Sequence, residues 1–252
     1  IIAPKKNYRV SVIVSLYNAE SKLRHFLSIL TQQTLWQKNQ LEIILVDSAS
    51  PQNEYQVFQQ FFSLDKTQNN SPQDIPVVYG RSEERETIQS AWNRGIVLSQ
   101  SPYITFLGVD EVVTSGSVEI LADELDRKND LDWVVGNSIV TEVDEKGKWL
   151  TDVMTYNRTN FSQHFTYLDT CYLTYVGGLY RRSIHQRFGF YDESFKGAGD
   201  TEFKNRILPH IKCGFVRDVR GIFLNYPEVR TTQSFFTELE DLRAWYIYRS
   251  IG

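Results

Sequence analysis

Two neighbouring acidic residues, Asp110 and Glu111, end a short apolar run that begins at Tyr103. The composition of the run predicts a buried strand, which would deliver both carboxylates to the rim of a sheet. In open α/β sheets ligands bind at the carboxyl ends of strands, and an acidic side chain there can hold a divalent cation against a phosphorylated ligand. Asp110 is therefore a candidate metal ligand, and an acidic loop after an ordinary strand is the alternative.

Other residues that could bind a ligand or react are two arginines, an asparagine and two cysteines. Arg81, Arg85 and Asn93 are candidates for binding a diphosphate, because a guanidinium matches phosphate geometry, and each is equally well explained as a solvated helix residue. Cys171 and Cys213 are too few for a disulfide scaffold and too far apart for a metal-binding pair. The two thiols indicate a reducing compartment.

Strand-like and helix-like segments alternate through the first half of the chain. Predicted strands cover residues 10–15, 41–46, 75–79 and 103–107, and predicted helices cover residues 21–30, 55–62, 87–100 and 117–127. This order implies a parallel sheet with right-handed crossovers, which is a nucleotide-binding type of α/β fold.

The second half has a less regular pattern. Residues 133–143 and 149–154 suggest a β-hairpin, residues 215–219 and 222–225 suggest two strands, and a glycine-rich turn at residues 197–199 opens a helix. A last helix, over residues 234–249, has apolar side chains on one side. We find no internal repeat and no linker, so the sequence predicts a single domain over residues 1–252.

Composition excludes several classes of partner. The chain has 252 residues, of which 41% are hydrophobic, so it can bury a large core. A net charge of −4 gives no reason to expect nucleic acid or an anionic membrane. The sequence has no run long enough for a membrane span and no signal peptide. We expect a cytoplasmic location. We also expect this chain to be excised from a longer one, other parts of which could hold it at the inner face of the membrane.

Five segments, in order and spacing, resemble family 2 glycosyltransferases of the GT-A fold. They are Val10–Asn18 (strand and Y-N loop), Leu41–Ser50 (V-D-x-x-S), Ala91–Gly95 (R-N-x-G), Tyr103–Glu111 (D-x-D) and Val176–Asp200 (G-x-x-x-x-R-R to E-D).

The chain departs from these patterns at three positions. Gly108 replaces the first Asp of D-x-D, Gly199 replaces the Glu before the base, and Trp92 replaces an Arg. The family's second metal ligand, often a His, has no match in residues 225–232, where Glu228 or Arg230 could substitute.

The resemblance implies a Rossmann-like, mostly parallel sheet flanked by helices, with a mixed second half. About residues 1–115 would bind the nucleotide, and about residues 116–252 would bind the acceptor. Asp200 would be the general base, although an Asp at a helix start is also a favoured N-cap. Glu202 and Arg182 would lie on the acceptor side, and the helix dipole explains Glu202 equally well. The donor-binding residues would be Tyr17, Asn18, Asp47, Arg85, Asn93 and Asp110, with Asp110 also the metal ligand.

The implied activity is inverting transfer of a sugar from a nucleotide-sugar, with a UDP-sugar favoured, to a saccharide or glycoconjugate hydroxyl in polysaccharide biosynthesis. Mg²⁺ or Mn²⁺ would neutralise the diphosphate. One alternative is a non-catalytic carbohydrate- or nucleotide-binding module that keeps the fold. Another is a nucleotidyltransferase, which the absence of a glycine-rich basic loop near the N-terminus disfavours.

Overall fold

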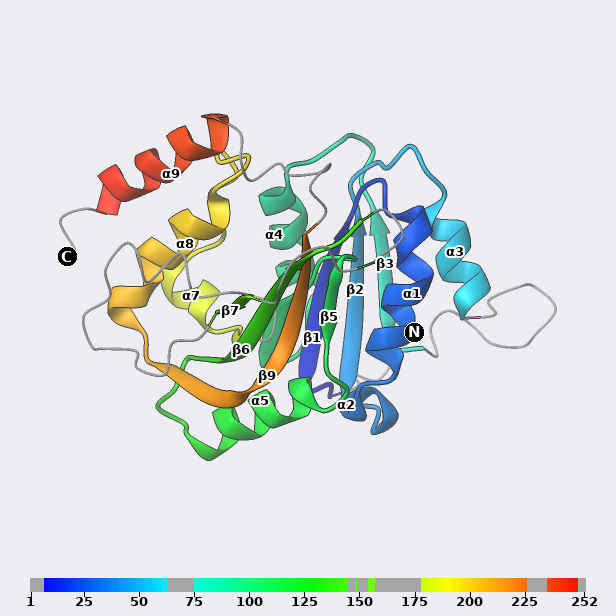
Figure 1. Cartoon of the computed structure of the whole chain (residues 1–252), viewed down its shortest axis with the longest axis horizontal. Coiled ribbons are helices and arrows are strands. Elements are labelled where there is room, and N and C mark those ends of the chain that lie inside the picture. The colour runs from blue at the N-terminus through cyan, green and yellow to red at the C-terminus, as the bar shows by residue number, and fades with distance from the viewer. Residues whose placement is uncertain are drawn as a thin grey trace.

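A computed structural model describes residues 7–62, 75–144, 148, 154–156, 178–225 and 235–248. Within these residues nine strands form one sheet in the order β3-β2-β1-β4-β8-β6-β9-β5, with β7 paired to β6 (Figure 1). The parallel part of the sheet consists of β1 (Val10–Leu16), β2 (Leu41–Asp47), β3 (Val77–Arg81) and β4 (Tyr103–Phe106). It agrees with the fold predicted for the first half.

The rest of the sheet mixes directions. Strand β8 (Gly178–Arg181) runs antiparallel to β4 and to β6 (Trp133–Glu142), while β9 (Cys213–Asn225) runs parallel to β6. Strand β5 (Glu111–Val113) pairs antiparallel with β9, and β7 (Met154–Tyr156) pairs antiparallel with β6. Of the second hairpin strand predicted over residues 149–154, only Met154 belongs to the described residues. The two strands expected over residues 215–225 are one strand, because β9 continues through an irregularity opposite Asn137.

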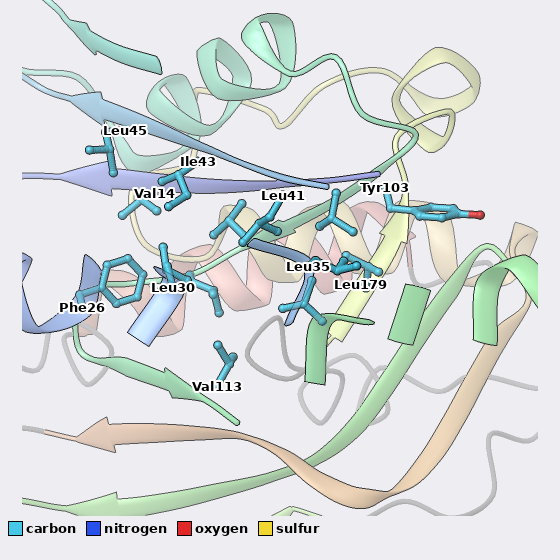
Figure 2. Packing of buried hydrophobic residues seen from close by; sticks show 14 of the residues in the cluster. Val14, Phe26, Leu30, Leu35, Leu41, Ile43, Leu45, Tyr103, Val113 and Leu179 are labelled. Atoms are coloured by element: carbon cyan, nitrogen blue, oxygen red, sulfur yellow. The ribbon is translucent and has the colours of Figure 1, made fainter. Parts of the chain in front are cut away.

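Alternation along the strands divides the core into two layers. Val12 and Val14 face one layer and Ile13 faces the other, because successive strand residues point to opposite faces. The first layer packs against α1 (Glu20–Thr31), α2 (Thr34–Gln37), α3 (Glu54–Phe61) and α5 (Ser117–Arg127). Figure 2 shows side chains of this layer, including Phe26 and Leu30 of α1 beneath the strands.

The second layer packs against α4 (Ile88–Leu98), α7 (Ile184–Phe188), α8 (Gly199–Ile207) and the short 3₁₀ helix at Leu208–His210. The last helix, α9 (Phe235–Tyr248), lies beside α8 at the edge of the molecule (Figure 1). Its predicted span is correct, but the large apolar side chains that share one side are exposed. They are Phe235, Leu239, Leu242 and Tyr246. None of the described helices is long and apolar enough to cross a bilayer.

Close approach of α4 to β1 depends on Gly95. A Cβ atom at Gly95 would overlap Cγ2 of Ile13, which is fully buried. We therefore expect Gly95→Val to lower the free energy of unfolding by about 1–3 kcal/mol, as overpacking does. Urea denaturation measures this change. Gly80→Val is the matched control, because a Cβ there meets only Leu98 Cδ1 at 3.8 Å, and equal losses in both variants would contradict the explanation.

Candidate active site

The carboxyl ends of three parallel strands meet in one row. Leu16, Asp47 and Arg81 are paired residue for residue across β1, β2 and β3. Asp47 is fully buried, and its Oδ2 accepts hydrogen bonds from the Tyr79 hydroxyl at 2.7 Å and from Arg81. Burial and this hydrogen bond raise the pKa of Tyr79. The Asp47 Oδ1 atom accepts from the Ser50 backbone N–H at 2.8 Å, which is the turn-capping contact typical of Asp.

The loops that follow β1 and β2 are tied together. Asn18, in the left-handed region at φ 53°, donates its backbone N–H to Ser50 Oγ at 3.0 Å. The Ser50 hydroxyl donates in turn to Glu54 Oε1 at 2.6 Å, and the same oxygen accepts from the Ala19 N–H at 2.8 Å. Asn tolerates positive φ better than most residues. Asn18 therefore fixes the loop that presents Tyr17.

Tyr17 and Arg85 form an exposed pair beside these loops. The Arg85 guanidinium carbon lies 4.1 Å from the centre of the Tyr17 ring, and the Tyr17 residue is 38% exposed. The pair is a cation–π contact that offers a flat aromatic and guanidinium surface to solvent. Such a surface suits stacking by a planar heterocycle.

Asp110 lies in the turn between β4 and β5, and Glu111 is the first residue of β5. Both carboxyl groups lie over Gly108, since a Cβ there would lie 2.5 Å from Asp110 Oδ1 and 3.8 Å from the Glu111 carboxyl carbon. Glu111 accepts a hydrogen bond from the Gly108 N–H at 2.8 Å. Burial and the neighbouring charge of Asp110 raise the pKa of Glu111 to about 8. Gly108 thus leaves room for two carboxyl groups where the D-x-D pattern also has two.

This pair fits a hard divalent cation that also binds a diphosphate. Mg²⁺ commonly takes one or two carboxylates together with substrate phosphates and waters. Across the described residues, no group of three or more His, Cys, Asp or Glu side chains could hold a metal by itself. The suggested substitutes Glu228 and Arg230 lie outside the described residues.

Asp200 is the second residue of α8 and is 34% exposed at its side chain. Its Oδ2 accepts from Lys204 Nζ at 2.8 Å, and that lysine side chain is only 6% exposed. Gly199 precedes it because a Cβ there would overlap the buried Gln89 side chain of α4. The E-D pattern has a carboxylate at the position of Gly199. Here that position has no side chain, which lets α8 pack closely on α4.

Two other motif positions make contacts inside the protein. The Asn93 amide pairs with the Tyr191 backbone, donating to its carbonyl at 3.0 Å and accepting from its N–H at 2.9 Å, and also donates to Glu193. Trp92 packs against Phe106 and Tyr191, with ring centres 4.7 and 5.1 Å apart. Asn93 and Trp92 thus join α4 to the segment that leads into α8.

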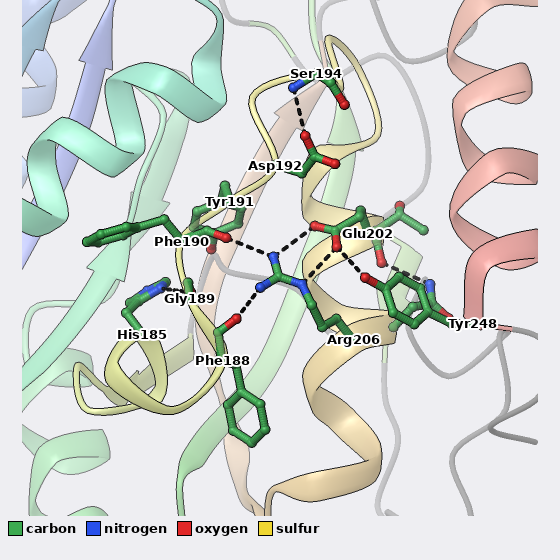
Figure 3. A network of polar contacts seen from close by, with 12 residues as sticks. His185, Phe188, Gly189, Phe190, Tyr191, Asp192, Ser194, Glu202, Arg206 and Tyr248 are labelled. Atoms are coloured by element: carbon green, nitrogen blue, oxygen red, sulfur yellow. Dashed lines mark hydrogen bonds and ion pairs between the residues drawn. The ribbon is translucent and has the colours of Figure 1, made fainter.

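The two predicted acceptor-side residues, Arg182 and Glu202, have different hydrogen-bond partners. Arg182 donates its Nε to the Ser101 carbonyl at 2.9 Å. Glu202 is buried and accepts from Arg206 Nε at 2.8 Å and from the Tyr248 hydroxyl at 2.7 Å, while Arg206 also donates to the Phe188 carbonyl (Figure 3). The structure therefore supplies an internal partner for each of the two side chains.

Sequence reasoning did not select two residues that the geometry adds. Glu111 follows Asp110 directly, so the acidic pair itself was the available signal. Lys204 is four residues from Asp200, a spacing at which helical side chains meet, but its burial follows only from the packing of α8.

Comparison with known proteins places these motifs in a family. The family described as Glycosyl transferase family 2 matches residues 11–189. The Bacillus subtilis (strain 168) protein named Uncharacterized glycosyltransferase EpsJ is 27% identical over 201 residues, which are 77% of this chain and 54% of that protein. The chain thus spans about half the length of this relative.

Two solved structures share the fold. Staphylococcus aureus TarS 1-349 in complex with UDP-GlcNAc has a TM-score of 0.73 at 14% identity, covering 96% of this chain and 66% of that one. The mannosyltransferase PcManGT from Pyrobaculum calidifontis, in complex with GDP-Man and Mn²⁺, has a TM-score of 0.60 at 15% identity, covering 98% and 62%. The family match over most of the chain, together with these folds, identifies the chain as a member of glycosyl transferase family 2.

Proposed function

We propose that this chain transfers a sugar from a nucleoside diphosphate sugar to a hydroxyl of a saccharide or glycoconjugate, with inversion at the anomeric carbon. The observation that carries the proposal is that Asp47 ends one strand, while Tyr17 and Asp110 follow two others, among neighbouring parallel strands of a family 2 fold. Ligands of open α/β sheets bind at this edge.

The nucleotide base would stack on the surface made by Tyr17 and Arg85. Asp47 is paired with Leu16, the residue before Tyr17, but its side chain is fully buried and bound to Arg81. A base therefore reaches the Asp47 carboxylate only if Arg81 swings aside, and otherwise meets the guanidinium. A UDP-sugar is favoured because the TarS structure, which shares the fold, was solved with UDP-GlcNAc.

The diphosphate would lie against Asp110 and Glu111, which would hold a Mg²⁺ or Mn²⁺ ion. That cation supplies positive charge to the diphosphate as the bond to the sugar breaks. The PcManGT structure, solved with GDP-Man and Mn²⁺, supports a metal at a related fold.

Asp200 would accept the proton of the attacking hydroxyl. Lys204 binds Oδ2, and among the described residues no partner is found for Oδ1. That oxygen is available to a hydroxyl at the start of α8. Direct displacement of the nucleotide by this hydroxyl inverts the anomeric centre, so a single base is sufficient.

The test is binding and transfer with purified protein, Mn²⁺ and a panel of UDP-sugars. We expect Tyr17→Ala to weaken UDP binding in calorimetry by about 5- to 150-fold, which corresponds to the stacking energy of about 1–3 kcal/mol per base. Tyr246→Ala, an exposed tyrosine on α9, is the matched control and should change UDP affinity less than twofold.

The same experiment decides between the candidate functions. If neither UDP nor GDP binds with any divalent cation, the transferase proposal fails. If UDP-sugars bind but are neither hydrolysed nor transferred to any acceptor in a saccharide panel, the chain is a binding module that has kept the fold.

A further inference from the structure

The carboxylate of Glu240, on α9, binds the turn that leads into α8. Its Oε2 accepts from the backbone N–H groups of Gly197 at 2.6 Å and Ala198 at 2.9 Å. Lys196 N–H lies 2.8 Å from Oε1 and 3.0 Å from Oε2. One buried carboxylate thus accepts from three consecutive N–H groups.

This contact lies at the N-terminus of α8, which has no side-chain cap of its own. The N-cap residue is Ala198, whose side chain cannot accept a hydrogen bond. Helix N-termini carry unpaired N–H groups and a positive dipole end, and both favour a carboxylate. Glu240 binds the N–H of the N-cap residue Ala198 and the two N–H groups before it. It does so from a helix that begins more than thirty residues later in the chain.

Further contacts from α9 fall on the same turn and on the first turn of α8. A Cβ at Gly197 would lie 2.7 Å from Thr237 Oγ1, so the absence of a side chain at Gly197 allows α9 to approach. Asp241 is hydrogen-bonded to Thr201, the residue after Asp200. Burial and, to a smaller extent, the charge of Asp200 raise the pKa of Asp241.

The attachment extends along both helices. Phe195 and Ala198 form a small apolar cluster with Ala244 of α9, and the Arg243 guanidinium lies 4.2 Å from the Phe195 ring centre. Tyr248 donates to Glu202 of α8 (Figure 3). The backbone that carries Asp200 is therefore fixed from α9 on its approach and along its first turn.

We propose that Glu240 is a positioning residue for Asp200, an inference that rests on the proposed function. The candidate base stands two residues after the last N–H group that Glu240 binds. Without the carboxylate, three N–H groups lose a charged acceptor and the turn relaxes, which moves Asp200 relative to the bound donor. A displacement of about 1 Å of a reacting group can cost about 100-fold in rate.

The test is Glu240→Gln, which keeps the shape and removes the charge. Gln offers one acceptor oxygen, and its NH₂ group would face N–H donors. We expect kcat for sugar transfer to fall about 100-fold while the affinity for UDP with Mn²⁺ changes less than twofold. Glu238→Gln, at an exposed position on the same helix, is the matched control and should leave both quantities unchanged.

A second pair of variants keeps the inference testable if Glu240→Gln does not fold. Gly197→Ala should lower kcat because its Cβ presses on Thr237 Oγ1. Adding Thr237→Ala removes that oxygen and keeps Glu240, so it should restore at least one tenth of the wild-type kcat. If Gly197→Ala lowers UDP affinity as much as kcat, or leaves kcat unchanged, the inference is overturned.

The outcomes are separable. If the wild-type chain shows no transfer, the proposed function fails and the inference with it. If the wild type is active and Glu240→Gln has the same kcat, a higher kcat, or an equal loss of UDP affinity, the inference is overturned while the proposed function stands.

Discussion

Replacing Asp200 with Asn is expected to lower kcat for sugar transfer by about 10³-fold, within the range of about 10²–10⁴ that general acid–base catalysis contributes. Asn has nearly the same shape, and its amide oxygen can still accept from Lys204, whose ammonium lies 2.8 Å from Asp200 Oδ2. The amide cannot take a proton from the acceptor hydroxyl. The loss should therefore appear in kcat, and the affinity for UDP with Mn²⁺ should stay within twofold of wild type.

The matched control is Asp123→Asn, at a side chain that is 61% exposed and paired with Arg9. It should keep wild-type kcat, because an exposed ion pair contributes at most about 1 kcal/mol to stability and lies outside the proposed site. If Asp200→Asn retains more than one tenth of wild-type kcat, Asp200 serves only as an ion-pair partner and first-turn acid of α8. Another residue would then have to act as the base.

The sequence was most informative where contacts are local. Alternating strands and helices over residues 10–127 predicted the parallel sheet, because apolar runs and helical spacing report burial on each element separately. The register of β1, β2 and β3 then follows from the parallel pairing, and it brings Asp47 and Arg81 side by side. The motif residues of this half could be placed at one sheet edge before any coordinates were known.

Packing between distant segments was not predictable in the same way. Periodicity showed which residues of α9 share a side, but Leu239 and Leu242 are exposed while Glu240 is buried against the turn before α8. A carboxylate in a helical sequence is ordinarily read as solvated, since burying a charge is costly without partners. Within the described part of the chain, its burial is explained by the three backbone N–H groups of residues 196–198, which are more than forty positions away.

The departures from the family pattern have local physical reasons once the neighbours are known. Trp92 packs against both Phe106 and Tyr191, and Gly199 admits the Gln89 side chain. Gly108 allows the Asp110 and Glu111 carboxyl groups to fold over the backbone. The number of carboxyl groups at the proposed metal site is therefore kept, although their positions in the sequence differ.

Asp110→Asn is expected to abolish the dependence of UDP binding on metal. In the wild type, we expect Mn²⁺ to tighten UDP binding by about 10²–10³-fold relative to EDTA, because a cation shared with a diphosphate contributes several kcal/mol. The Asp110 carboxylate lies closer than that of Glu111 to the position a Cβ atom would take at Gly108, and burial together with the charge of Asp110 raises the pKa of Glu111 to about 8. Asn at position 110 removes one of the two carboxyl groups and leaves Glu111 as the other, so UDP affinity should be nearly equal with Mn²⁺ and with EDTA.

Two further variants locate the effect at this pair of carboxyl groups. Glu111→Gln keeps Asp110 and should reduce the Mn²⁺ enhancement only in part, whereas Asp130→Asn, at an exposed side chain on the surface, should leave it unchanged. Calorimetric titration of UDP into each variant, with Mn²⁺ and with EDTA, gives the ratio directly. A wild-type ratio in Asp110→Asn would remove Asp110 from the metal site, and a ratio near one in the wild type would show that this chain binds its nucleotide without a cation. In the second case the diphosphate charge would have to be met by arginines such as Arg85, whose guanidinium already lies beside Tyr17, and Arg85→Ala would then weaken UDP binding to the same extent with Mn²⁺ and with EDTA.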